Sequence, residues 1–261
     1  MGTKIIKEIS NKTLGNGDMM TINKNQIFLK DKEKSQIKWA GYTSLIQGLI
    51  LFVPLFVLGA AINWPASLED PASIALPRLL ENESAVRTGY LFYLIYSIIF
   101  LIAISFLTEL VLGKNNQILL KLIIGFAVAS VLARSIGIIR WLAPMYDLAN
   151  LWKISEDENQ RNAISVVFDA LNSYGGTIGE VLGVSIFASL AIFLISIGNF
   201  LYKSLPKWFS FFGLISSIGL ILTSLEIVGY DPGAAVITLG TTLVQLWFLF
   251  TGFWLLRQSQ K

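Results

Sequence analysis

The chain has 261 residues, of which 54% are hydrophobic and only 14% are charged, and its formal net charge is +3. Soluble proteins average about 25% charged residues, so this composition leaves too little polar surface for a protein surrounded by water. The sequence contains no cysteine and no histidine. Disulfides, thiolate nucleophiles, imidazole bases and histidine-ligated haem or iron are therefore excluded.

The first segment, residues 1–38, is polar and rich in lysine, asparagine and threonine. It does not contain the apolar stretch typical of a secretory signal peptide, and its composition predicts a mostly disordered, basic cytoplasmic tail. We expect one transmembrane domain over residues 39–257 and a short cytoplasmic terminus over residues 258–261.

Six long apolar segments follow the tail, and each can cross about 30 Å of hydrocarbon at about 1.5 Å per residue. Because backbone groups in lipid must be hydrogen-bonded within their own segment, all six are predicted to be helices. The expected fold is an all-α integral membrane protein, a bundle of six transmembrane helices, in which Pro54 kinks the first helix. The segments run approximately over Trp39–Ile62, Gly89–Leu112, Ile118–Leu142, Gly176–Tyr202, Trp208–Gly229 and Gly233–Leu256.

Lysine and arginine are distributed unevenly between the two sides of this bundle. The side that holds both termini carries 14 of them, whereas the opposite loops carry four, together with ten Asp and Glu residues. Cytoplasmic loops are enriched in Lys and Arg, so both termini are predicted to be cytoplasmic. The basic excess then reflects topology and attraction to anionic lipid, and we expect no nucleic-acid partner.

Two of the loops on the outer side are long. Residues 63–87 contain two prolines and are expected to form a short surface helix. Residues 143–175, before the fourth span, place Ile164, Val167, Phe168 and Leu171 on one face of a helix. This pattern predicts an amphipathic helix, which either lies on the membrane surface or packs over the bundle.

Small residues recur every fourth position on two of the spans. Gly175, Gly179 and Gly183 form one stripe at the start of the fourth span, and the third span carries a second stripe, made of Gly125, Ala129, Ala133 and Gly137. Small residues let membrane helices approach closely. We therefore predict that the third and fourth spans pack through these stripes.

Four charged residues lie near or inside the outer half of the bundle: Arg134 and Arg140 on the third span, Glu180 on the fourth and Glu226 on the fifth. An unpaired charge at the centre of the bilayer costs about 2.5–3.5 kcal/mol on insertion scales. We therefore predict contacts among these arginines and glutamates, and we expect the long side chain of Arg134 to reach outward.

The same charged layer suggests a polar pocket that opens outward. Trp141 follows Arg134 by seven residues and shares its face, and Tyr174 is expected near the entrance. The structural alternative is that the charges only lock the helices in register. No nucleotide-binding or hydrolase motif occurs in a suitable context, so no catalytic residue, cofactor or metal is expected.

Three stretches carry a resemblance to a known family: AVRTGYLFYLIYS in the second span, ARSIGIIRW in the third, and VFDALNSYGGTIGEVLG leading into the fourth. Together they resemble uncharacterised bacterial multi-spanning proteins known as domain of unknown function 4386, over roughly residues 39–256. The resemblance implies a helical bundle in a bacterial inner membrane. It implies no activity.

The sequence favours a membrane protein that is not an enzyme and that binds, or helps to move, a small anionic or amphipathic molecule. One alternative is a structural or regulatory subunit that docks a partner protein through the glycine stripes and the amphipathic helix. Another is a membrane enzyme that acts on a lipid-like substrate through Glu180 or Glu226. The lipid bilayer is the expected surrounding in each case.

Overall fold

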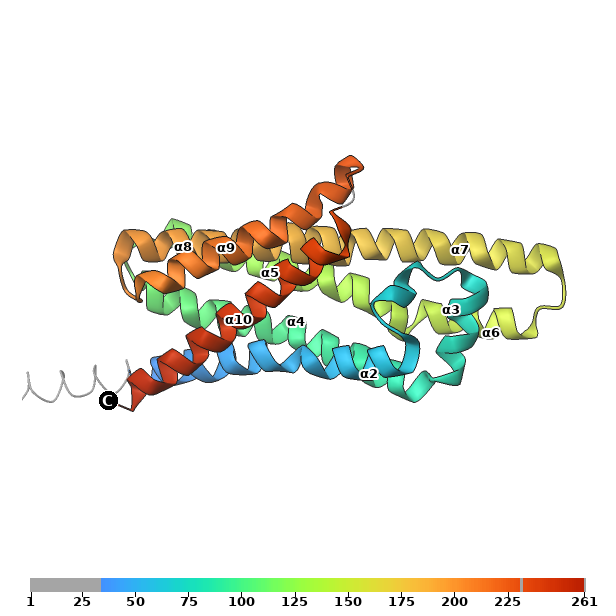
Figure 1. The fold of residues 1–261 in the computed structure, drawn as a ribbon, viewed down its shortest axis with the longest axis horizontal. Helices are drawn as coiled ribbons and strands as arrows, with labels where there is room; N and C mark the ends of the chain where they lie inside the picture. The colour runs from blue at the N-terminus through green and yellow to red at the C-terminus, as the bar shows by residue number, and fades with distance from the viewer. Residues whose placement is uncertain (1–33, 231, 261) are drawn as a thin grey trace, which may run out of the picture.

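The computed structural model describes residues 34–230 and 232–260, and its helices lie side by side in an elongated bundle (Figure 1). Six helices in this part of the chain are long and apolar enough to cross a membrane, which confirms the predicted all-α, multi-span fold. Most of the predicted tail lies outside the described residues, although residues 34–38 are already helical.

A first helix over residues 34–50 precedes the others. The helices that follow are α2 (Phe52–Ile62), α3 (Ala72–Glu81), α4 (Glu83–Leu112), α5 (Gln117–Leu142), α6 (Pro144–Ile154), α7 (Glu158–Gly176), α8 (Ser189–Tyr202), α9 (Lys207–Thr223) and α10 (Gly233–Ser259), with a π-helix η2 (Thr177–Ala188) and 3-10 turns η1 (Ala66–Glu69) and η3 (Ser224–Val228).

The first span is interrupted at Leu51, which separates the helix over residues 34–50 from α2. Pro54 accounts for the position of this break, because proline has no N–H to donate four residues back and its ring clashes with that carbonyl group. The next residue, Leu55, donates to the Leu51 carbonyl at 3.2 Å. The helix therefore resumes at once, and the span keeps its length.

The fourth span belongs to a much longer helix than the sequence pattern predicts. The segments α7, η2 and α8 follow one another without a loop, as one 45-residue helix over Glu158–Tyr202. At 1.5 Å per residue such a helix is on the order of 65 Å long, about twice the thickness of the hydrocarbon layer. The predicted helix before the fourth span is therefore present as α7, and it continues the direction of the bundle beyond its other spans (Figure 1).

Helices α3, α6 and α7 pack together at one end of the molecule, and we call this assembly the cap (Figure 1). Phe168 on α7 is 1% exposed and packs with a cluster that includes Leu76 and Met145, whereas Val167 is 46% exposed. The Nδ2 atom of Asn172 also donates to the Leu68 carbonyl at 2.8 Å. The apolar face of α7 thus packs against other helices of the same chain.

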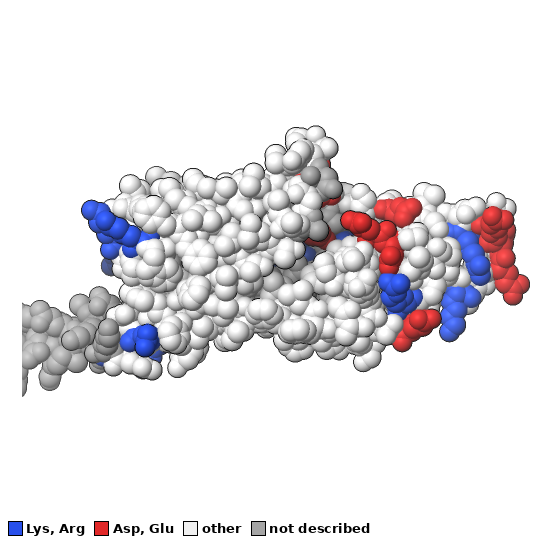
Figure 2. Space-filling model, viewed as in Figure 1, with Lys and Arg blue, Asp and Glu red and all other residues white. Residues whose placement is uncertain are grey.

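The end opposite the cap, where α8 meets α9, is called the basic end. On the face that Figure 2 shows, Lys and Arg are gathered there, the middle of the molecule is uncharged, and Asp and Glu lie toward the cap together with further basic residues. An uncharged belt between two charged ends is expected of a protein that spans a bilayer, because burying a charged side chain in hydrocarbon costs free energy.

A second core fills the basic half of the bundle around Phe100, Phe209, Trp247 and Phe248. Helix α10 crosses α9 obliquely (Figure 1). The two helices approach closely because each has a glycine at the crossing, Gly219 on α9 and Gly240 on α10. A Cβ atom on Gly240 would lie 2.7 Å from the backbone oxygen of Gly219. The hydrophobic side chains in this half of the molecule are thus buried against one another.

Candidate functional site

Helix α5 and the π-helix η2 touch each other through backbone atoms. A Cβ atom on Gly137 would lie 2.8 Å from the Cα atom of Gly179 and 2.9 Å from the Gly175 oxygen, so no side chain fits between them. A little deeper, the Ser130 hydroxyl donates to the Gly183 carbonyl at 2.7 Å. We call this contact the glycine seam. The predicted packing of the third and fourth spans is what the structure shows here.

The stripe on the third span takes part only over its second half. Ala133 is 7% exposed and contacts the position of Gly183. Gly125 is exposed, with nothing within 4 Å of a Cβ atom placed there, and Ala129 is partly exposed. The prediction that Gly125 packs against the fourth span is therefore wrong, because α5 meets that span here through other residues: the ring of the adjacent Phe126 lies 6.3 Å from that of Phe187, whereas Gly125 is exposed.

Arg140, in the last turn of α5, lies along the open side of the glycine seam. Its side chain passes Gly175 so closely that a Cβ atom on that glycine would lie 2.6 Å from the Arg140 Cδ atom. The residue is only 6% exposed. Its Nη2 atom is 3.6 Å from the Glu180 Oε1 atom, and its Nε atom has no hydrogen-bond partner. The glycines thus make room for a buried cation next to a carboxylate.

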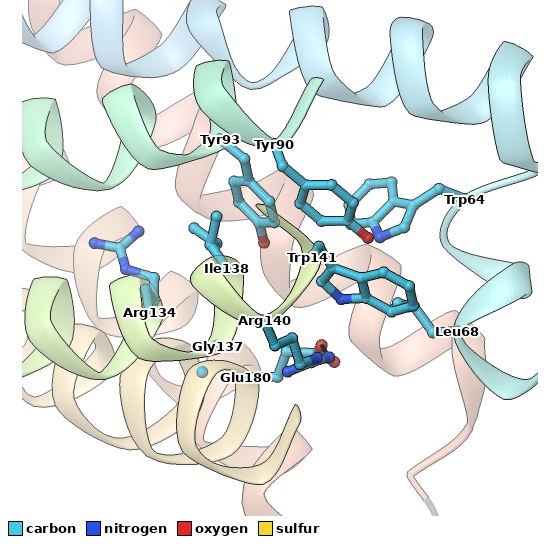
Figure 3. A pocket seen from close by; sticks show the side chains of 11 residues that line it. Trp64, Leu68, Tyr90, Tyr93, Arg134, Gly137, Ile138, Arg140, Trp141 and Glu180 are labelled. Atoms are coloured by element: carbon cyan, nitrogen blue, oxygen red, sulfur yellow. Dashed lines mark ion pairs between the residues drawn. The ribbon is translucent and has the colours of Figure 1, made fainter. Parts of the chain in front are cut away.

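A cleft opens beside this ion pair, and aromatic rings form most of its walls (Figure 3). Tyr90 and Trp141 are stacked with ring centroids 5.5 Å apart, and Trp64 meets Tyr93 edge-on at 5.7 Å. The Tyr90 hydroxyl is buried and has no hydrogen-bond partner. The space measures about 340 Å³, including the part open to the surroundings. We call it the aromatic cleft.

Arg134 contributes to the inner wall of this cleft, but its charge is directed elsewhere. Figure 3 shows its guanidinium group pointing away from Arg140 and Glu180. The Cζ atom lies 4.6 Å from the centre of the Phe100 ring and 5.4 Å from that of Tyr96, and both rings are deeper along α4 than the cleft tyrosines. The expectation that Arg134 reaches outward is therefore wrong, since aromatic faces inside the bundle attract its cation.

The predicted network of four charges reduces to one pair. Within the described residues, the ion pairs are Arg140–Glu180, Arg78–Asp70 and Arg87–Glu83, and neither Arg134 nor Glu226 takes part in one. Glu226 is exposed in the 3-10 turn η3 at the end of the fifth span. Tyr174 is 68% exposed and does not line the cleft. Both side chains are exposed, and Glu226 lies near enough to Glu180 for the two carboxylates to interact, although Glu226 has no ion pair of its own among the described residues.

Three aromatic residues of the cleft were not predicted from the sequence as site residues: Trp64, Tyr90 and Tyr93. The two tyrosines lie three residues apart on one face of α4, and Trp64 follows the first span directly. That spacing was visible, but aromatic residues near span ends are also typical of the membrane interface. Only the stacking of Tyr90 on Trp141 of α5 distinguishes a cleft residue from an ordinary aromatic residue of the membrane interface.

In the cleft, the guanidinium group of Arg140 has an N–H group without a hydrogen-bond partner, and the Glu180 carboxylate competes with any anion for this cation. Arginine binds oxyanions through several N–H groups at once. In the described part of the chain, no three metal-binding side chains lie together as a metal site would require. Glu180 is 56% exposed at its side chain, so it can leave Arg140 without being buried elsewhere.

Comparison with other proteins adds the family. No curated protein and no solved structure matches the chain. A family model described as a domain of unknown function, DUF4386, matches residues 41–258, which is most of the sequence and includes the cleft, the glycine seam and the cap. The chain therefore belongs to the DUF4386 family, as the three resembling stretches of its sequence predict.

Proposed function

We propose that the protein binds a small anion, or the anionic headgroup of an amphipathic molecule, in the aromatic cleft, with Arg140 as the anion-binding residue. Support comes from one observation above all. Arg140 is buried with an unbonded Nε atom, and its contact with Glu180 measures 3.6 Å. A strong charge-assisted hydrogen bond is about 2.7–2.9 Å long, so donors of this cation are still available for a ligand.

The surroundings of Arg140 favour a ligand that is anionic at one point and apolar elsewhere. Aromatic walls exclude water, and a charge interaction is stronger where water is excluded. The space in the cleft that a water-sized molecule can occupy is only about 30 Å³, which is enough for a few water molecules at most. We therefore expect only the charged head of a ligand, of phosphate or carboxylate size, to reach Arg140 from the open side of the cleft, with any acyl chain outside it in lipid.

Thermal unfolding of the purified protein in detergent tests this function with two probes of the same chemistry: inorganic phosphate and a short-chain phosphatidic acid. We expect at least one to raise the unfolding temperature. A response to phosphate alone indicates a free anion, and a response to the phosphatidic acid alone indicates a lipid headgroup.

Two substitutions should then act in opposite directions. Arg140→Gln should lower the affinity at least about tenfold, which corresponds to the loss of one charge-assisted hydrogen bond. Glu180→Gln should raise the affinity, because it removes the carboxylate that competes for Arg140. Arg161→Gln, at an exposed arginine of the cap, is the matched control and should bind as the wild type does.

A purely structural ion pair predicts a different result. Both substitutions would then lower the unfolding temperature to a similar extent, and neither probe would stabilise the wild type. That outcome would refute the proposed function.

A further inference from the structure

A second polar cluster lies deeper in the bundle, and its members come from four different spans. They are Gln47 on the first helix, Tyr96 on α4, Arg134 on α5 and Gln245 on α10, all less than 8% exposed. We call them the central polar cluster. No residue of this cluster other than Arg134 lines the aromatic cleft.

Contacts between neighbours hold the cluster together. The Gln245 Nε2 atom donates to the Tyr96 hydroxyl oxygen at 2.8 Å, and the Arg134 guanidinium lies beside the same tyrosine ring. The first helix reaches this level at Gly48, where a Cβ atom would lie 3.1 Å from the Gln245 backbone oxygen. Gln47, the residue before it, is completely buried.

Several polar atoms of the cluster have no hydrogen-bond partner. They are the Nε and Nη2 atoms of Arg134, both polar side-chain atoms of Gln47, and the Oε1 atom of Gln245. Three nitrogen donors and two amide oxygens are thus unused within one buried layer. Buried polar groups in proteins are almost always hydrogen-bonded, so these donors and acceptors are available to a ligand.

The net charge of the central polar cluster indicates which kind of ligand it could bind. Arg134 takes part in none of the ion pairs among the described residues, and the other members of the cluster are neutral. The rings of Phe100 and Tyr96 stabilise the cation, but a cation–π contact is made with the charge and not with the N–H groups, and the Nε and Nη2 atoms of Arg134 have no hydrogen-bond partner. The layer therefore carries one positive charge and surplus donors.

We propose that the central polar cluster binds a monovalent inorganic anion of halide size. A single negative charge balances Arg134, and the free N–H groups of Arg134 and Gln47 are its donors. The surrounding side chains Phe100, Trp247 and Phe248 are fully buried, so a ligand with a chain does not fit. The amide oxygens of the two glutamines can then turn toward the guanidinium group.

This site differs from that of the proposed function, since Arg140 and Glu180 take no part in it and Arg134 is the one residue that the central polar cluster shares with the lining of the aromatic cleft. The test uses bromide as the probe. Purified protein is exchanged into sodium gluconate and titrated with sodium bromide at constant ionic strength, while its unfolding temperature is followed; bromide is then located by anomalous diffraction in crystals of the same protein.

We expect bromide to raise the unfolding temperature of Arg140→Gln, which lacks the anion-binding residue of the aromatic cleft, and to give an anomalous peak beside Arg134. When it is added to Arg140→Gln, Arg134→Gln should abolish the shift, and Gln47→Leu should weaken bromide binding at least about threefold. Arg257→Gln and Gln117→Leu make the same substitutions at exposed positions and should leave it unchanged.

If Arg134→Gln does not fold, the response of Gln47→Leu decides the matter. The proposal is overturned if bromide does not stabilise the wild type more than gluconate does. It is also overturned if the shift of Arg140→Gln persists when Arg134→Gln is added, or if in the same background Gln47→Leu binds bromide as well as Gln117→Leu does.

Discussion

Arg140 can occupy its position because the adjacent Gly175 has no side chain. A Cβ atom on Gly175 would lie 2.6 Å from the Arg140 Cδ atom and 2.8 Å from its Nη1 atom, whereas one on Gly176 would lie 3.5 Å from the nearest Arg140 atom. The first distance requires the arginine to move, and the second is ordinary van der Waals contact. Two adjacent glycines of one helix thus differ sharply in what a methyl group would do.

Gly175→Ala should therefore displace Arg140 from the edge of the cleft, and Gly176→Ala should not. Both changes remove a helical glycine and gain about the same 1 kcal/mol in helix propensity, so they form a matched pair. We expect Gly175→Ala to reduce the stabilisation by the anion probe at least about fivefold in apparent affinity, in line with the partial loss of a charge-assisted contact. Equal affinities in the two variants, measured by the same thermal titration, would show that Arg140 does not position the ligand.

At the scale of elements, the glycine seam joins α5 to the π-helical segment η2 of the 45-residue helix. In η2 the backbone follows the π-helical pattern, and the Ser185 hydroxyl donates to the Glu180 carbonyl five residues back. Segments of π-helix are rare and are frequently found at functional sites. Here the π-helix presents its glycines to α5 and places Glu180 beside the cleft.

Gly137→Ala and Gly125→Ala compare two glycines of the same helix and the same sequence stripe. A methyl group on Gly137 would meet backbone atoms of the fourth span at 2.8 and 2.9 Å, and backbone cannot move aside as a side chain can. Overpacking of this kind costs about 1–3 kcal/mol, so Gly137→Ala should lower the unfolding temperature. Gly125→Ala meets nothing and should be neutral or stabilising. A comparable loss in both variants would contradict the assignment of the seam.

The sequence predicts the six spans and the helix pair of the seam, because both follow from local composition and four-residue spacing. It does not reveal which face of α5 meets the fourth span at each level, which decides that Gly137 is in contact and Gly125 is not. Nor does it reveal the direction of Arg134, because the attracting rings of Tyr96 and Phe100 come from another helix. The cleft itself is formed by four segments of the chain, and the residue spacing within one segment cannot show that the four meet.

At the scale of the whole molecule, the two ends differ in charge and in shape. The cap end carries the acidic residues and the projecting helix α7, and the basic end carries short turns with lysine and arginine (Figures 1 and 2). Short cytoplasmic loops are rich in Lys and Arg, so we expect the cap and the aromatic cleft to lie on the outer side of the membrane. A ligand of the cleft would then arrive from outside or from the outer leaflet.

Single-cysteine labelling can test this orientation directly, because the native chain has no cysteine. Asn159→Cys, in the first turn of α7, and Asn115→Cys, in the turn between α4 and α5, are both exposed and neither changes the charge of its loop. A membrane-impermeant maleimide should label Asn159→Cys in intact cells and Asn115→Cys only after permeabilisation. The reverse pattern would place the cleft on the cytoplasmic side, and the ligand would then have to be a cytoplasmic anion or an inner-leaflet lipid.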